Sequence, residues 1–226
     1  MLNDFFSLIY PNTCVICSKP LPNNKSKWCF LCDLRLPKTF LDPQHNAIHK
    51  ALGHQFPITF GFAPYYFKKG NSIQQILHNL KYEGDKEIGK QMGTQIGHHI
   101  IQKEALDEID VIMPVPLHAS KLNSRGYNQS QIIGETLSEC VRKPQITGNL
   151  YRKRRSTTQT HKSRFKRWES TQGVFGLKDS TSLTGKHVAI VDDVFTTGAT
   201  IGACLEVLGT VDKIKISVIT VAIADY

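Results

Sequence analysis

From about residue 58 onward, the hydrophobic positions follow two periods in turn, one typical of helices and one typical of strands. Helices are expected where apolar residues recur every three or four positions, and strands where short β-branched or alternating runs occur. The expected helices span 72–82, 85–101, 127–141 and 199–208, and the expected strands lie within 58–67, 110–117, 188–191 and 214–222. Strands that alternate with helices imply right-handed crossovers between parallel strands. We therefore predict an α/β fold built on a mainly parallel sheet with flanking helices.

The N-terminal part of the chain has a different pattern, in which cysteines stand out. Four of the six cysteines form two C-x-x-C pairs with eleven residues between them, namely Cys14 with Cys17 and Cys29 with Cys32. Four thiolates at this spacing suit tetrahedral Zn²⁺ and fill its coordination shell, so a structural zinc is expected. Disulfide bonds are the alternative. The N-terminus carries an acid rather than basic residues before its short apolar run, which is not typical of a secretory signal, so we expect a zinc ribbon in the reducing cytoplasm.

These patterns divide the chain into three parts. Residues 1–37 are expected to form the zinc ribbon, with a short apolar helix within residues 1–11. Residues 38–57 are polar and mixed and indicate a linker or hood region, whereas residues 58–226 carry the α/β pattern. Apolar runs stay well short of the roughly 20 residues that a membrane-spanning helix needs. No membrane span is therefore expected.

The net charge of +9 is concentrated in one segment of the 226-residue chain. Residues 142–167 contain ten of the 28 Lys and Arg and no acid, so the rest of the chain is close to neutral, with 18 basic and 19 acidic residues. Such a segment attracts the phosphates of a small ligand or of a nucleic acid, and both attractions weaken with salt. A solvated basic loop is the alternative.

Residues 188–200, VAIVDDVFTTGAT, carry the strongest chemical signal in the chain. A short apolar strand leads to two adjacent carboxylates, and a turn rich in threonine and glycine then opens a helix. The unpaired N–H groups of the first helical turn and the threonine hydroxyls suit a phosphate monoester. Asp192 and Asp193 would repel that phosphate, so their expected partners are the hydroxyls of a ribose diol or a cation shared with the ligand. An acidic turn that only caps the helix is the alternative.

A second loop is expected to face the same ligand. In sheets of this kind ligands bind beyond the carboxyl ends of the strands, so the loops after residues 117 and 191 should lie together. The first of these loops offers His118, Lys121 and Arg125, which are typical phosphate-binding residues. For Arg125, helix capping or pairing with a surface acid is an alternative role.

The 188–200 segment closely resembles the phosphoribosyl-pyrophosphate (PRPP) motif of type I phosphoribosyltransferases. The resemblance implies that Asp192 and Asp193, as the catalytic pair, face the ribose 2- and 3-hydroxyls, and that residues 196–200 hold the 5-phosphate. The PRPP-binding residues implied in this way are Val191, Asp192, Asp193, Thr196, Thr197, Gly198, Ala199 and Thr200. The pyrophosphate loop implied by the same resemblance consists of His118, Ala119, Ser120, Lys121 and Arg125. Mg²⁺ would enter with PRPP, held mainly by pyrophosphate and ribose oxygens.

The chain also resembles the ComF family of competence proteins along nearly its whole length. This resemblance rests on the cysteine pairs, the diacid segment, LKYEGDKEIG at 80–89, PVPLHASKLNSRGYNQS at 114–130 and RKRRSTTQTHKSRFKRWES at 152–170. Members are similar to phosphoribosyltransferases, carry an N-terminal zinc ribbon and are associated with DNA uptake during natural transformation. The resemblance implies a flexible loop that closes over PRPP, with contacts from Arg154, Thr158, Gln159 and Arg167.

Two functions of different classes are compatible with these patterns. The first is a Mg²⁺-dependent phosphoribosyltransferase, a glycosyltransferase that uses PRPP and an unidentified acceptor. The second is a non-catalytic module that senses PRPP or a nucleotide and binds single-stranded DNA or a helicase-like partner. Base stacking in this second case would use aromatic residues near basic ones, namely Trp28 with Phe30 and Phe165 with Trp168. Release of pyrophosphate from PRPP would distinguish the two functions.

Overall fold

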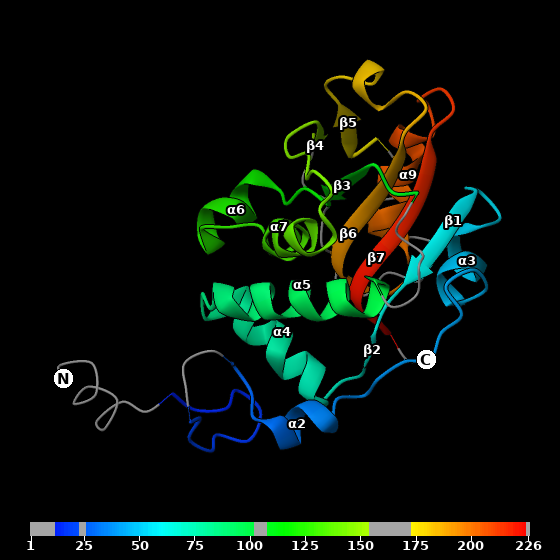
Figure 1. The fold of residues 1–226 in the computed structure, drawn as a ribbon. Coiled ribbons are helices and arrows are strands. Elements are labelled where there is room, and N and C mark those ends of the chain that lie inside the picture. The colour runs from blue at the N-terminus through cyan, green and yellow to red at the C-terminus, as the bar shows by residue number, and fades with distance from the viewer. Residues whose placement is uncertain (1–11, 23–25, 102–107, 154–172, 225–226) are drawn as a thin grey trace.

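The computed structural model describes residues 12–22, 26–101, 108–153 and 173–224 (Figure 1). The expected short helix within residues 1–11 lies outside these ranges. The helices are α2 (Phe30–Leu34), α3 (Ala47–Leu52), α4 (Ser72–Tyr82), α5 (Lys86–Ile101), α6 (Ala119–Arg125), α7 (Gln129–Val141), η1 (Thr181–Leu183) and α9 (Ala199–Leu208). The strands are β1 (Ile58–Phe62), β2 (Tyr65–Phe67), β3 (Val111–Pro114), β4 (Leu150–Arg152), β5 (Phe175–Leu177), β6 (His187–Phe195) and β7 (Lys215–Ala224).

A parallel sheet forms the centre of the molecule, with the strand order β1-β7-β6-β3. The strand pairs described in this sheet are all parallel, and β2 pairs with the part of β7 that lies beyond β1. Pro114 at the end of β3 pairs with Val191 of β6, directly before the diacid. A separate antiparallel pair is formed by β4 and β5. The predicted α/β class, a mainly parallel sheet with flanking helices, is confirmed.

Helices cover both faces of the sheet (Figure 1). Neighbouring residues of a strand point to opposite faces, and β6 shows this alternation clearly. Ala189 and Val191 belong to the core that includes α4, α5 and α7, whereas Val188 and Ile190 belong to the core that includes α3 and α9. These four side chains are fully buried, so β6 is apolar on both sides from Val188 to Val191, directly before the two aspartates. In the described part of the chain, the helices are too short or too polar to span a membrane.

Two short helices differ from the sequence-based expectation. Residues 47–52, within the expected linker or hood region, form α3, and Asn46 caps this helix by accepting a hydrogen bond from Ile48 N. Residues 119–125, expected as a loop, form α6. Helices of one or two turns show too few apolar repeats to give a periodic signal, which is why the pattern missed them. The division of the chain after residues 37 and 57 stays a prediction.

Candidate functional site

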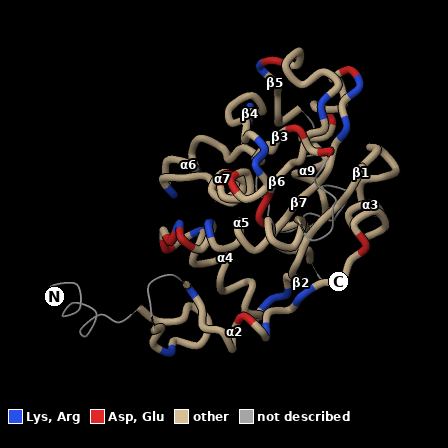
Figure 2. Tube along the Cα trace, viewed as in Figure 1, with Lys and Arg blue, Asp and Glu red and all other residues tan. Residues whose placement is uncertain are grey.

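The two aspartates of the predicted site lie in the last part of β6 rather than in a loop. The apolar pattern predicted a strand end at Val191, but β6 continues to Phe195, and Asp192 pairs with Thr220 of β7. Figure 2 shows this acidic stretch at the lower end of β6. Adjacent residues of a strand point to opposite sides, so Asp192 and Asp193 contact different groups. A strand inside the sheet, rather than a flexible turn, therefore sets the positions of both carboxylates.

Asp193 forms a largely buried ion pair with Lys81, near the end of α4. The distance from Lys81 Nζ to Asp193 Oδ2 is 2.6 Å, and the lysine and aspartate side chains are 25% and 15% exposed. Burial by itself would lower the pKa of Lys81, but Asp193 and Asp192 outweigh it and raise that pKa. The ammonium therefore stays charged, so the protein itself supplies a cation to the diacid. Lys81 was not predicted as a site residue, although it lies in the stretch 80–89 that carries part of the family resemblance.

Asp192 accepts hydrogen bonds from a side chain and from the backbone. Its Oδ1 accepts from Ser130 Oγ at 2.8 Å and from Asp193 N at 2.9 Å. Burial and the charge of Asp193 raise the pKa of Asp192 to about 7, although these hydrogen bonds and Lys81 act in the opposite direction. Ser130 lies in the first turn of α7, so α7 contacts the carboxyl end of β6, whereas the predicted meeting of the loops after residues 117 and 191 at one ligand stays a prediction. Ser130 was not predicted as a site residue, although it ends the stretch 114–130 that carries part of the family resemblance.

We expect the raised pKa of Asp192 to make the stability of the protein depend on pH. The carboxyl group ionises near pH 3.8 in the unfolded chain and near pH 7 in the folded protein, so the unfolded state binds fewer protons between these values. The contribution of Asp192 to the free energy of unfolding therefore falls as the pH rises through this window. Asp192→Asn should remove that fall. Urea unfolding of both proteins at the two ends of the window measures it, and equal pH dependences would contradict the expectation.

The threonine- and glycine-rich turn leads from β6 into the N-terminus of α9. Gly198 has a φ of +78°, which favours glycine, and a Cβ at this position would lie 3.0 Å from the ring of Phe195. The N-cap residue of α9 is Gly198, which has no side chain to cap the helix. Ala199 N donates a long hydrogen bond of 3.4 Å to Thr197 Oγ1. Apart from Ala199 N, the first-turn N–H groups of α9 are therefore available to an anion, which the helix dipole also favours.

A small hollow lies at this turn. Its volume is about 20 Å³, and it is lined by Asp192, Val194, Phe195, Thr196, Gly198, Ala199, Thr200 and Ile201. This is room for about one water molecule. Thr196 is exposed, and Thr197 and Thr200 are half-buried. The side chain of Val191, by contrast, is fully buried, so it supports the strand and does not face the hollow.

The expected pyrophosphate loop is largely helical, which corrects the loop expected from the sequence. His118 caps α6, and its Nδ1 lies 3.1 Å from Ser120 N and 2.9 Å from Ser120 Oγ. A side chain that satisfies a first-turn N–H group stabilises a helix start, so this polar segment folds as a helix. Ala119, Ser120 and Lys121 are exposed on α6. Their side chains remain accessible to a ligand, whereas the His118 ring is engaged in the cap.

Several cationic side chains interact electrostatically with the diacid or with one another. Partial burial, together with Arg125 and Arg152, lowers the pKa of Lys121. Burial also lowers the pKa of Arg152, while the charge of Asp192 opposes this effect. Lys81 adds to the same group, because its charge also acts on Lys121. These side chains therefore share one electrostatic neighbourhood at the carboxyl end of β6.

Arg125 contacts an amide and an aromatic ring rather than a surface acid. Its Nη1 donates to Gln129 Oε1 at 3.0 Å, and its guanidinium lies 5.1 Å from the centre of the Tyr82 ring. The other amide atom of Gln129, Nε2, is buried and has no hydrogen-bond partner among the described residues. Arg125 is half-buried and held in place, which leaves its positive charge near the diacid.

The implied flexible-loop residues lie outside the described residues. They are Arg154, Thr158, Gln159 and Arg167, and Phe165 and Trp168 lie in the same segment. The described chain reaches Lys153, directly after β4, where the Arg152 guanidinium lies 5.3 Å from the centre of the Phe175 ring. The loop assignments therefore stay predictions.

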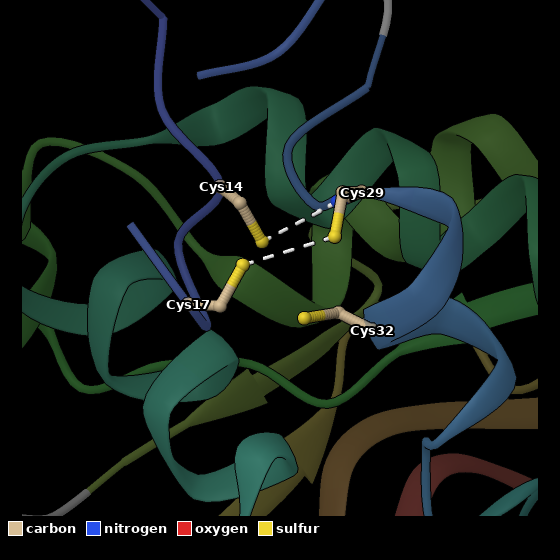
Figure 3. Close-up of side chains that lie close together, drawn as sticks. All are labelled: Cys14, Cys17, Cys29 and Cys32. Atoms are coloured by element: carbon tan, nitrogen blue, oxygen red, sulfur yellow. Dashed lines mark hydrogen bonds between the residues drawn. The ribbon is translucent and has the colours of Figure 1, made fainter. Parts of the chain in front are cut away.

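The four paired cysteines come together as a cluster (Figure 3). Their sulfur atoms all lie within 4.8 Å of one another, and Cys17 Sγ is 3.8 Å from Cys29 Sγ. Tetrahedral zinc with Zn–S bonds of about 2.3 Å places its sulfurs about 3.8 Å apart, whereas a disulfide would hold them at about 2.05 Å. All six cysteines of the chain are free thiols. The expected four-thiolate cluster is confirmed, and it can hold a structural zinc ion.

Backbone amides favour the thiolate of Cys14, the form that binds zinc, whereas burial and hydrogen bonds with the other three cysteines raise the pKa of Cys32. Burial would raise the pKa of Cys14, but N–H groups of Cys17, Cys29 and Ile16 lower it to about 6. Cys29 N donates to Cys14 Sγ at 3.3 Å. The donor set and the surrounding amides therefore both fit a metal centre.

The cysteine lobe, which comprises residues 12–22 and 26–37, is bound to the α4–α5 hairpin by polar contacts. Lys27 forms an ion pair of 2.9 Å with Asp85 and donates from its backbone N to Gln91 Oε1 at 2.8 Å. Asp33 Oδ1 accepts from Gln95 Nε2 at 2.7 Å. The lobe therefore packs beside the same helical hairpin that carries Lys81 to the diacid.

Trp28 is a structural residue of this lobe, so its expected role in base stacking is wrong. Its side chain is 2% exposed, and its indole Nε1 donates to Asp33 Oδ1 at 2.8 Å. The ring has no free face for a base because the lobe and α5 enclose it. Phe30 on α2, in contrast, is 73% exposed.

The fold and the site together define an α/β protein with a candidate anion and ribose site at the carboxyl end of a parallel sheet and a separate four-thiolate centre. No protein-family model matches the chain. The DNA utilization protein YhgH of Escherichia coli K12 is 26% identical over 199 residues, which cover 86% of this chain and 83% of that protein. Competence protein ComFC of Bacillus subtilis is 28% identical over 57% of this chain and 50% of that protein. Competence protein F of Haemophilus influenzae is 32% identical over 44% of each chain.

These relatives confirm the resemblance to the ComF competence proteins that the motifs indicated. The matches to ComFC and competence protein F span about half the length of those proteins. Among solved structures, a structure of Leishmania donovani UMP synthase aligns with 76% of this chain and 30% of its own, at 15% identity and a TM-score of 0.34.

Proposed function

We propose that this chain binds PRPP, or a closely related ribose phosphate, at the carboxyl end of β6. The observation that supports this most is the meeting of three features at one sheet edge: the diacid, the uncapped start of α9 and a group of cations. Ribose hydroxyls would donate to Asp192 and Asp193, and residues 196–200 would bind the 5-phosphate. The cations of α6 and β4 would face the pyrophosphate.

The reaction that we propose is Mg²⁺-dependent phosphoribosyl transfer to an acceptor. The bond from C1 to the pyrophosphate oxygen breaks, and its electron pair leaves with pyrophosphate. The acceptor forms a new bond to C1 and loses its proton to solvent. Positive charge develops on the ribose near Asp192 and Asp193, and negative charge develops on the leaving group near Lys121 and Arg152. Mg²⁺, held by ligand oxygens and only indirectly by the diacid, would neutralise the leaving group further.

Binding and catalysis are tested separately. PRPP with Mg²⁺ should raise the melting temperature of the protein in a saturable way, because a ligand at 100 times its Kd stabilises the folded state by about 2.7 kcal/mol. Inorganic phosphate at the same concentration is the control and should have a much smaller effect. Incubation with PRPP, Mg²⁺ and a panel of nucleobases should release pyrophosphate with the acceptor that the enzyme uses. A melting temperature that PRPP does not change would overturn the assignment of the site.

A second candidate is a non-catalytic module that senses PRPP or a nucleotide and acts with single-stranded DNA or a helicase-like partner. Two observations favour it: the names of the relatives refer to competence and DNA utilization, and a basic segment follows β4. Stabilisation by PRPP without release of pyrophosphate for any acceptor would favour this candidate. Under both candidates the free thiols support a cytoplasmic location, where cysteines stay reduced.

A further inference from the structure

Lys81 already contacts Asp193 Oδ2, and under the proposed function the same carboxylate would contact a ribose hydroxyl. The two charged groups are 2.6 Å apart and only 25% and 15% exposed. Leu77 and Leu80, on the same turn of α4, are buried in the core, so the backbone that carries Lys81 is firmly held. A ribose diol that approaches Asp193 must therefore compete with an ammonium that is already bound there.

The free-energy cost of displacing the Lys81 ammonium from Asp193 depends on which ligand binds. A largely buried charge that loses its partner is strongly unfavourable unless another charge replaces it. In ribose 5-phosphate the anionic group lies at the other end of the sugar from C1. PRPP carries a pyrophosphate on C1, next to the 2-hydroxyl. Only the second ligand brings an anion to the place where Lys81 would be released.

The neighbouring cations increase this dependence on the ligand. Arg125 already acts to lower the pKa of Lys81, which Asp193 and Asp192 outweigh. In the same way, the positive charges of Lys81, Arg125 and Arg152 act to lower the pKa of Lys121. An ammonium released from Asp193 would therefore face like charges on several sides. A polyanionic group beside C1 would offset this repulsion.

We propose that Lys81 is the counter-cation of the diacid in the ligand-free protein, and that it makes the site select ribose phosphates that carry a second anionic group at C1. The inference rests on the proposed function, since it requires a ribose phosphate to bind at the diacid. It deepens that function, because it assigns the choice between PRPP and ribose 5-phosphate to one side chain on α4. Lys81 sets this choice without contacting the 5-phosphate.

Isothermal titration calorimetry with Mg²⁺ and either PRPP or ribose 5-phosphate tests the selectivity. We expect Lys81→Met to lower the affinity for PRPP about ten- to a hundredfold, the range of one charge-assisted hydrogen bond, and to leave the affinity for ribose 5-phosphate unchanged or higher. Lys81→Arg should keep most of the preference for PRPP. Lys90→Met is the matched control, because Lys90 is exposed on α5 and pairs with the exposed Glu87.

The possible outcomes separate this inference from the proposed function. A wild-type protein that binds neither ligand would overturn both. Wild-type binding of PRPP combined with an equal loss of both ligands in Lys81→Met would overturn the selective role only and leave Lys81 a structural partner of Asp193. If circular dichroism shows that Lys81→Met is unfolded, the affinities for the two ligands are compared in two other variants. These are Lys81→Arg and the double variant Lys81→Met with Asp193→Asn, which removes both charges.

The counter-cation role has a readout that needs no ribose phosphate. Without Lys81 the two carboxylates should attract a divalent cation, since carboxylate oxygens are the ligands that such ions prefer. Mn²⁺ titration followed by electron paramagnetic resonance should show tighter binding to Lys81→Met than to the wild-type protein. Addition of Asp192→Asn should abolish the gain. Equal Mn²⁺ binding by wild type and Lys81→Met would contradict the counter-cation role.

Discussion

Asp192→Asn is expected to remove most of the affinity of the protein for PRPP while the fold stays intact. Asparagine keeps the shape of aspartate and can still accept the hydrogen bond from Ser130 Oγ, so the register of β6 should persist. The variant lacks the negative charge that would accept a ribose hydroxyl. A hydrogen bond to a charged group contributes about 1.5–3 kcal/mol, which corresponds to a ten- to hundredfold loss of affinity. Calorimetric titration with PRPP and Mg²⁺ measures this loss.

Asp212→Asn is the matched control for this variant. Asp212 is exposed and precedes β7, so it lies at the opposite end of the sheet from the diacid. The control should bind PRPP as the wild type does. Asp193→Asn is a less direct test, because it leaves the ammonium of Lys81 without its carboxylate. Wild-type affinity in Asp192→Asn would show that PRPP binds elsewhere.

Removal of the metal is expected to unfold the cysteine lobe and to expose Trp28. Structural zinc contributes about 10–16 kcal/mol of apparent binding free energy in zinc-finger peptides near pH 7, and in such small units this is folding free energy. Trp28 is 2% exposed in the folded lobe. Trp168→Phe makes Trp28 the only tryptophan of the chain. The fluorescence emission of this variant should shift to longer wavelength when a strong chelator is added.

Two cysteine variants complete the test of the metal centre. Cys29→Ser removes one ligand and should shift the Trp28 emission without a chelator. Cys140→Ser is the control, since Cys140 is a free thiol in α7 outside the cluster. It should retain the metal and the wild-type emission. Zinc loss that leaves the emission of Trp28 unchanged would mean that contacts with α5 hold the lobe without the metal.

The order of helices and strands in the α/β part was predictable because each element buries a continuous apolar face. In α4 the residues Ile73, Ile76, Leu77 and Leu80 recur at helical spacing, and all four are buried. Strands such as β6 are apolar on both faces and contrast sharply with the polar turns beside them. The short elements were missed, as α3 and the three-residue strands β4 and β5 are too short to show a period.

The chemistry of the candidate site was predictable mainly where it lies within one segment or, as for Lys121, in a loop expected at the carboxyl ends of the strands. The adjacent Asp192 and Asp193, with the threonines that follow, formed a recognisable pattern, as did the cysteine pairs. Lys81 and Ser130 were not predictable, because they come from α4 and α7 and reach the diacid only across the folded sheet. The burial of Trp28 was missed for the same reason, since it depends on the packing of the lobe.

The amino-acid order thus specified which groups can bind a phosphate, a ribose diol or a zinc ion, because those properties depend on residue type and spacing along a short stretch of chain. It also specified the α/β class through the period of the apolar residues. The tertiary structure decided which charges pair with one another, because the crossovers bring α4, α6 and α7 to the carboxyl end of β6. A charge pair depends on distance and burial, and for residues that are far apart in the chain both arise only when the tertiary structure forms.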